Sequence, residues 1–139
     1  MSPFSHYLYE LRNSRRISQL AIAELMGYAQ GYISSLELGK KLPNDEFLNK
    51  LIQILNLNLS EAEALRKSAK ESQRRYVLAQ NADLEQYKLV HDLWNKLDLL
   101  HPAQLRAIKE VLNFPYSQEL RGISEADNNQ LKRKGERPM

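Results

Sequence analysis

Two short helical patterns that meet at Gly27 constrain the fold of this chain more than any other feature. The first covers residues 19–26 and the second residues 29–38. A small side chain at Ala23 lets the second helix come close, and glycine supplies a turn conformation that other residues resist. Two helices that cross at a steep angle through a tight turn need such an arrangement. The positions that carry it are Gln19, Ala23, Gly27, Ile33 and Leu36.

The second of these helices has a glycine, Gly31, in its interior. An interior glycine costs a helix roughly 1 kcal/mol relative to alanine, so a helix that served only the core would not favour one. Ile33 and Leu36 are spaced to anchor the helix on the core. The remaining positions form an open face that we expect to meet another surface: Gln30, Gly31, Ser34 and Ser35.

The rest of the chain also shows helical spacing and no alternating strand pattern, which predicts an all-α fold. We expect a first helix that ends near Arg16, a second capped by Ser18 with Leu20, Ala23 and Leu25 turned inward, and a third that stops at Gly39. The fourth is expected to open at Pro43 and Asn44, the fifth at a capping box formed by Ser60-Glu61-Ala62-Glu63. Two more helices are expected over Leu84 to Leu99 and Pro102 to Leu112.

These patterns divide the chain of 139 residues into three parts. Residues 1–80 are predicted to form the helix-turn-helix domain with a trailing helix. Residues 81–114 are predicted to form a helical hairpin. Residues 115–139 are polar and aperiodic, which predicts a flexible tail.

Composition excludes several classes of protein. The chain has no cysteine, so it has neither disulfides nor thiolate metal sites, which fits a reducing compartment. No apolar run approaches the roughly 20 residues of a membrane span, and the first ten residues do not resemble a signal peptide. We therefore expect a cytoplasmic protein that does not enter the membrane. The net charge is +3, and the positive excess lies near the front, beside the two short helices.

The segment ISQLAIAELMGYAQGYISSLELGKKLP resembles the Cro/phage-repressor-type helix-turn-helix, often called the XRE family. The resemblance covers roughly residues 4 to 58 and implies a five-helix DNA-binding domain whose third helix enters the major groove. It also implies that Gln19 touches a backbone phosphate and that Gln30 reads a base edge. This chain departs from the pattern at Ala29, where the family commonly has a Ser or Thr cap, and at Gly31, a position often used for base contact. The set in register is Gln19, Ala23, Gly27, Gln30, Ile33, Ser34, Glu37, Gly39 and Pro43.

The chemistry of the residues suits that role. A glutamine offers a carbonyl acceptor and an amide donor, which fit adenine N6 and N7, respectively, as a bidentate pair. Hydroxyls can bond bases or phosphates, lysines can neutralise phosphates, and free amides at a helix start can bind another phosphate. Tyr32 either packs on the core or lies along the DNA backbone. The predicted DNA-binding residues are Gln19, Gln30, Gly31, Tyr32, Ser34, Ser35, Lys40, Lys41 and Asn44.

The segment outside the resemblance carries a long apolar stripe. Its spacing predicts two helices that fold back as an antiparallel hairpin and still leave apolar surface for a second copy of the chain. The alternative is that the hairpin packs on its own N-terminal domain and completes a single core. The residues expected to support dimerisation are Leu84, Tyr87, Val90, Trp94, Leu97, Leu105 and Ile108.

The sequence therefore predicts a dimeric, sequence-specific regulator of transcription that binds double-stranded DNA and acts as a repressor. An antitoxin-like or adaptor protein that binds a protein partner through the C-terminal helices is the main alternative, and an accessory subunit of an enzyme is a third. Scattered histidines, with no HExxH motif and no clustered carboxylates, give no support for catalysis, a metal site or a cofactor.

Overall fold

A computed structural model describes residues 1–115 of the chain. The chain divides into two compact units, Met1–Val77 and Leu78–Met139, here called the N-terminal and C-terminal units. All regular structure in the described residues is helical, which confirms the predicted all-α class. The predicted flexible tail lies, from residue 116 onward, outside the described residues.

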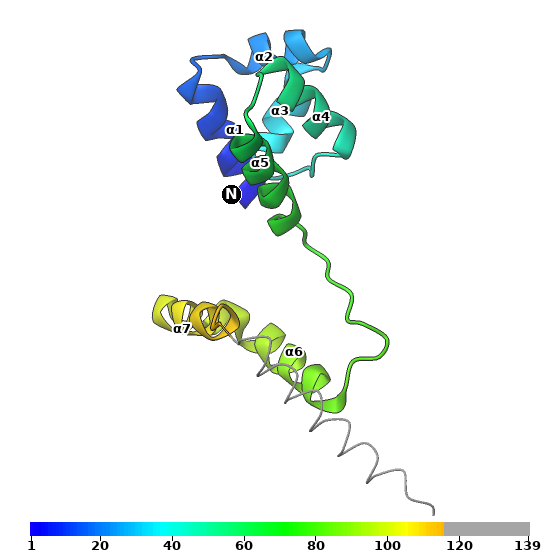
Figure 1. Ribbon diagram of the computed structural model, residues 1–139, viewed down its shortest axis with the longest axis vertical. Coiled ribbons are helices and arrows are strands. Elements are labelled where there is room, and N and C mark those ends of the chain that lie inside the picture. The colour runs from blue at the N-terminus through cyan, green and yellow to red at the C-terminus, as the bar shows by residue number, and fades with distance from the viewer. Residues whose placement is uncertain (116–139) are drawn as a thin grey trace, which may run out of the picture. The chain divides into compact units, whose positions relative to one another are not determined.

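The N-terminal unit consists of five helices wrapped around one core (Figure 1). α1 packs against α5 and α3, α2 packs against α3 and α4, and α4 packs against α5. The first helix ends two residues before the expected position, at Ser14, and Arg16 then takes a positive φ of 54° in the turn toward α2. The helices are α1 (Pro3–Ser14), α2 (Gln19–Met26), α3 (Gln30–Glu37), α4 (Asp45–Ile54) and α5 (Leu59–Glu71).

Local sequence signals set the ends of these helices. Ser18 caps α2 by accepting a hydrogen bond from the Ala21 backbone amide, as predicted. Gly27 ends α2 in the left-handed region at φ 75°, the conformation for which glycine was expected. The prediction for α5 was wrong in detail, because its cap is Asn58 and not Ser60. Asn58 and Glu61 form the reciprocal capping box, so α5 begins earlier, at Leu59.

The core corrects one further prediction, the inward face of α2. Ala23 is buried as expected, but Leu20 and Leu25 are exposed, and Ile22 and Met26 take the inner positions instead. An eight-residue helix with apolar side chains on most sides has no clear polar face, so periodicity could not fix its rotation. Packing against α3 and α4 fixes it.

The seam between α1 and α5 is held by polar contacts as well as by apolar ones. The buried Ser72 hydroxyl accepts a hydrogen bond at 2.8 Å from the Phe4 backbone amide, one of the donors that a helix start leaves unpaired. Near the other end of α1, Arg15 donates to the Glu61 carboxylate at 3.0 Å. This hydrogen bond lowers the pKa of Glu61 below its ordinary value, so the contact stabilises the fold above that ordinary pKa and weakens as pH falls through the lowered one.

The C-terminal unit consists of α6 (Leu84–Lys96), a 3₁₀ turn (Leu97–Leu99) and α7 (Pro102–Leu112). Asp83 caps α6, and His101 caps α7 with Pro102 at the first helical position, as predicted for that boundary. The packing differs from the expected closed hairpin, because α6 and α7 do not lie side by side and neither helix buries a residue. Most residues of their apolar stripes are exposed.

Removal of the Ser72 hydroxyl tests the α1–α5 seam. Ser72→Ala should lower the free energy of unfolding by about 1–3 kcal/mol, because it leaves the buried Phe4 amide without an acceptor. Ser60→Ala is the matched control, since Ser60 is exposed in the first turn of α5. Urea denaturation of both variants gives the comparison. Equal effects of the two substitutions would show that the hydroxyl does not hold the seam.

Candidate nucleic-acid interface

Helix α3 has one face in the core and one face in solvent. Ile33 and Leu36 are fully buried and anchor the helix, as the sequence predicted. Gln30 and Gly31 are exposed on the opposite face. The outer face of α3 is thus uncharged, polar and free of bulky side chains at its first turn.

Neither packing nor backbone geometry requires the glycine at position 31. Apart from its two chain neighbours and the backbone of α3 itself, no heavy atom would lie within 4 Å of a Cβ atom built on Gly31. The φ of Gly31 lies outside the left-handed region that favours glycine. Gly39, by contrast, has a φ of +74°. The missing side chain at Gly31 therefore leaves space on the solvent side, where a second molecule can come close to the α3 backbone.

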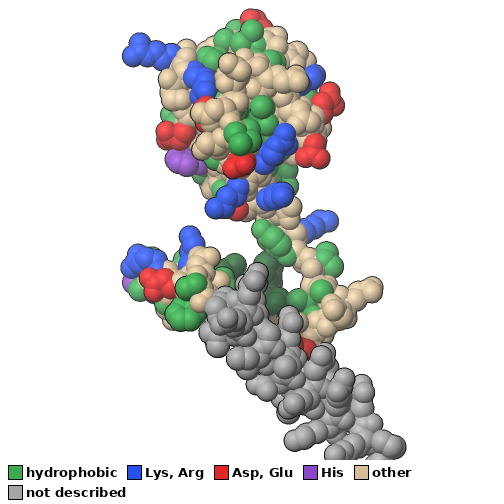
Figure 2. All heavy atoms as spheres, in the orientation of Figure 1, with side chains coloured by type: hydrophobic (Ala, Val, Ile, Leu, Met, Phe, Trp, Pro, Cys, Tyr) green, Lys and Arg blue, Asp and Glu red, His purple; other side chains and the backbone are tan. Residues whose placement is uncertain are grey.

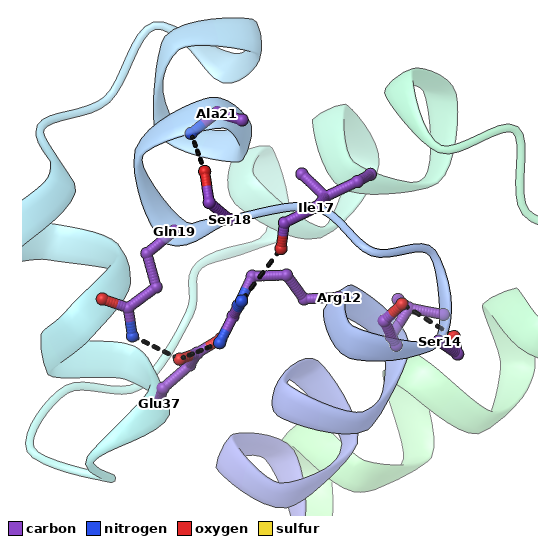
Figure 3. Close-up of polar contacts among 8 residues, drawn as sticks. Arg12, Ser14, Ile17, Ser18, Gln19, Ala21 and Glu37 are labelled. Carbon is purple, nitrogen blue, oxygen red and sulfur yellow. Dashed lines mark hydrogen bonds and ion pairs between the residues drawn. The ribbon is translucent and has the colours of Figure 1, made fainter.

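The last residue of α3 carries a buried charge that joins three helices (Figure 3). Glu37 is 6% exposed. Its carboxylate accepts hydrogen bonds from the Arg12 guanidinium of α1, at 2.6 and 3.3 Å, and from the carboxamide of Gln19 at the start of α2. Arg12 also donates to the Ile17 carbonyl in the connection between α1 and α2. The network fixes the rotation of α3 relative to both preceding helices.

This network gives Gln19 a structural partner. One N–H of its carboxamide is used on Glu37, while the second N–H and the carbonyl oxygen have no hydrogen-bond partner in the described part of the chain. The side chain is half-buried. The predicted phosphate contact of Gln19 stays a prediction, and the structure adds that Glu37 would orient the amide for it.

Tyr32 packs on the core as a half-buried side chain, which is one of the two positions considered for it. Its ring lies 5.0 Å from the Tyr28 ring and 5.8 Å from the Phe47 ring, centroid to centroid. Burial, with a smaller contribution from the neighbouring Tyr28, raises the pKa of the Tyr32 hydroxyl. The Lys41 ammonium lies 5.6 Å from the centre of the same ring. Tyr32 thus forms a platform that holds one of the predicted phosphate-binding lysines.

The residues that follow α3 include both basic and acidic side chains. Lys40 and Lys41 are exposed directly after the helix. Asn44 caps α4 by accepting a hydrogen bond from the Phe47 amide at 2.8 Å, so its carbonyl oxygen is occupied. Asp45 and Glu46 occupy the first turn of α4. A phosphate at the start of α4 would meet these carboxylates, so the lysines are better placed than Asn44 to bind one.

The predicted DNA-binding residues therefore come mostly from one continuous segment. Gln30 and Gly31 are exposed on α3, Ser34 and Ser35 are half-buried on the same helix, and the two lysines follow it. Sequence reasoning missed the role of Arg12 and Glu37 as the pair that positions α3. A signal was present, since Glu37 lies one residue after Leu36 and four after Ile33, on the inward side of the helix. A charge at such a position needs a partner.

The predicted dimerisation residues all lie in the C-terminal unit. Trp94 is 73% exposed, and the other positions of the α6 stripe are exposed as well. On α7, Leu105 is exposed and Ile108 is half-buried. The structure thus gives these side chains little cover.

Residues 1–115 give no support for a metal site or for a membrane-spanning helix. The described residues contain no group of histidine and acidic side chains arranged to hold a metal ion. No helix among them has the length and apolar character needed to cross a membrane.

The five-helix core, the Gly27 turn and the polar outer face of α3 together define a helix-turn-helix DNA-binding domain. Residues 8–61 match the helix-turn-helix family of Cro/phage-repressor type, which confirms the resemblance inferred from the sequence. The chain thus carries the DNA-binding domain of an XRE-type transcriptional regulator. Proteins of the XRE family are DNA-binding regulators. No curated protein and no solved structure shows significant similarity to the chain.

Removal of one partner from the buried pair tests how α3 is held. Arg12→Met should lower the free energy of unfolding by about 3–5 kcal/mol, because Glu37 keeps a buried charge without its cation. The double variant Arg12→Met/Glu37→Leu should be more stable than this single variant, because neither charge then remains. Urea denaturation measures both. A double variant as unstable as Arg12→Met would show that the cost comes from lost packing rather than from an unpaired charge.

Proposed function

We propose that this protein is a sequence-specific repressor that binds double-stranded DNA as a dimer and blocks transcription by occupying its operator. The observation that carries the proposal is the two-sided character of α3. Its inner face is fixed by Ile33, Leu36 and the Glu37 network, while its outer face offers Gln30 beside the open space at Gly31. A helix held this firmly with an unobstructed polar face suits the major groove.

Gln30 is the residue proposed to read a base. It lies in the first turn of α3, is exposed, and has no side-chain partner in the described structure that would compete for its amide. A carboxamide in this position can donate to adenine N7 and accept from adenine N6. Ser34 and Ser35, half-buried further along the helix, add hydroxyls for bases or the sugar–phosphate backbone.

Lys40 and Lys41 are proposed to contact the phosphates beside the groove. The Tyr32 ring keeps the Lys41 ammonium close to the end of α3, which reduces the entropy lost when it meets a phosphate. These contacts would set the register of α3 in the groove and supply affinity without sequence preference.

The C-terminal unit is proposed to bring two chains together. A helix whose apolar residues recur at helical spacing, with none of them buried, has an uncovered hydrophobic face. A second copy would cover the stripe of Leu84, Tyr87, Val90, Trp94 and Leu97. A two-fold dimer would then place two α3 helices about 34–36 Å apart, one turn of DNA, on a near-palindromic operator.

The same exposed stripe is the observation that favours the second candidate function. An adaptor or antitoxin-like protein would use it to bind a different protein. The two functions differ in solution, because a repressor dimer forms from the purified chain alone, whereas an adaptor stays monomeric until its partner is added.

Substitution of the proposed base-reading residue tests the DNA contact. Gln30→Ala should weaken binding to the selected operator by about 1–3 kcal/mol and relax the preference at one base pair, because the bidentate contact is lost. Selection of bound duplexes from a random pool, followed by titration, measures both effects. Gln53→Ala, at an exposed position near the end of α4, is the control. An unchanged selected motif in Gln30→Ala would exclude base reading by this residue.

Gly31→Ala separates stability from binding. The added methyl group meets no other residue, so the variant should unfold with a free energy up to about 1 kcal/mol higher than the wild type. Operator affinity should nevertheless fall, because the methyl group enters space that the DNA is proposed to occupy. Denaturation and duplex titration together give the result. A more stable variant with full affinity would show that DNA does not approach α3 at this position.

Trp94→Asp tests dimerisation. The wild type should scatter light as a dimer at micromolar concentration. The variant should be a monomer with a folded N-terminal unit and poor operator affinity, because a charge replaces the apolar centre of the stripe. Asn95→Asp, which adds the same charge at the next position, should remain a dimer. A monomeric wild type would contradict the proposed dimer and favour the adaptor function. Circular dichroism of Trp94→Asp checks that the N-terminal unit stays folded.

A further inference from the structure

Three segments that are distant in the sequence meet at one end of the N-terminal unit. The Ser72 hydroxyl holds the end of α5 against the first turn of α1 through the Phe4 amide. Gly39, in the turn after α3, comes so close to the start of α1 that an added Cβ would lie 3.6 Å from the Ser2 backbone nitrogen. The turn after α3 and the residues after α5 therefore both lie beside the start of α1.

A depression of ≈ 680 Å³ opens where these segments meet. Its basic side chains come in two adjacent pairs, Lys40 and Lys41 from the turn after α3, and Arg74 and Arg75 from the chain after α5. Among residues 1–115, no acidic residue lines it. Figure 2 shows Lys and Arg side chains around the end of the N-terminal unit where α5 finishes. We call this depression and its four cations the basic pocket.

Several basic residues of the N-terminal unit have acidic partners, and the four cations of the basic pocket are not among them. Arg12, Arg15, Lys50 and Lys67 each form an ion pair with a glutamate. Within residues 1–115, no carboxylate lies within ion-pair distance of any cation of the basic pocket. Like charges that gather in a concave site without counter-charges raise the local positive potential and attract anions.

We propose that the basic pocket binds phosphate groups, with Arg74 and Arg75 as its main donors. A guanidinium matches phosphate oxygens with two parallel N–H bonds, which an ammonium cannot do. Both arginines lie outside the matched residues 8–61, so this site extends the phosphate-binding surface beyond the helix-turn-helix itself. The hydrogen bond of Ser72 supports such a site, because it fixes the chain directly before Gln73, Arg74 and Arg75.

The phosphate can come from the DNA backbone or from a free phosphorylated molecule. The backbone is the source that fits the position best, because Lys40 and Lys41 line the basic pocket and also flank the outer face of α3. The choice of the DNA backbone as the source of the phosphate rests on the proposed function. A duplex seated on α3 would then continue past Lys41 toward Arg74 and Arg75, so the DNA flanking the core operator would add affinity without adding sequence preference.

Charge-neutralising variants of the full chain test the proposal against duplex DNA. The single variants Arg74→Gln and Arg75→Gln and their double variant are compared with Lys67→Gln, whose lysine is exposed on α5 and does not line the basic pocket. Operator binding is titrated over a range of salt concentrations. The double variant should reduce the slope of log affinity against log salt by about two, each single variant by about one, and Lys67→Gln by nothing. Thermal unfolding checks that all variants stay folded.

Titration with pyrophosphate, followed by NMR signals of the arginine side chains, tests the basic pocket without DNA. Saturable shifts at Arg74 and Arg75, accompanied by shifts of the Gly39 backbone amide in the wild type but not in the double variant, together with an unchanged salt slope, would support the site with a free phosphorylated ligand as its source. The same shifts in a wild type that binds no duplex would support the site and contradict the proposed repressor function. An unchanged salt slope together with no pyrophosphate shifts would overturn the proposal.

Discussion

The buried carboxylate of Glu37 is the contact on which the DNA-binding face depends. It lies at the end of α3 and accepts hydrogen bonds from Arg12 of α1 and Gln19 of α2. Apolar contacts at Ile33 and Leu36 hold α3 on the core, but such contacts are not directional and tolerate small rotations. A charge-assisted fork is directional, so it selects one rotation of the helix. The outward direction of Gln30 follows from that choice.

Two further features order the chain at the end of the N-terminal unit where α5 finishes. The Ser72 hydroxyl holds the end of α5 against the start of α1, and Gly39 brings the turn after α3 close to that same start. Ser72 and Gly39 both lie where the chain leaves a helix. Together they determine which cations face one another, although none of those cations takes part in either contact.

The sequence predicted most of the helix-turn-helix because its determinants are local. Ser18, Gly27 and the Ile33/Leu36 pair act within a few residues, and each has the predicted role in the structure. The rotation of α2 could not be predicted, because a short helix with apolar residues on most sides takes its orientation from α3 and α4. The same limit applied to the capping of α5, where two overlapping cap signals compete and Asn58 forms the box in place of Ser60.

Contacts between distant residues were the part that the sequence did not reveal. Arg12 and Glu37 are 25 positions apart, and only the fold places them together. Arg74 lies beyond the end of α5 and shares a depression with Lys40 and Lys41, more than 30 positions earlier in the chain. For the C-terminal unit the spacing indicated apolar stripes correctly, but periodicity does not say whether two such helices cover each other.

The absence of buried residues in α6 and α7 has a consequence for the response of this protein to its own abundance. Isolated helices of this length are only marginally stable in water, so their order must come mainly from whatever covers their apolar faces. If the cover is a second chain, folding of the C-terminal unit and pairing are one equilibrium, and mass action makes both depend on protein concentration. The N-terminal unit has its own core and would stay folded at any dilution. Occupancy of a two-half-site operator would then rise more steeply than in proportion to the amount of protein in the cell.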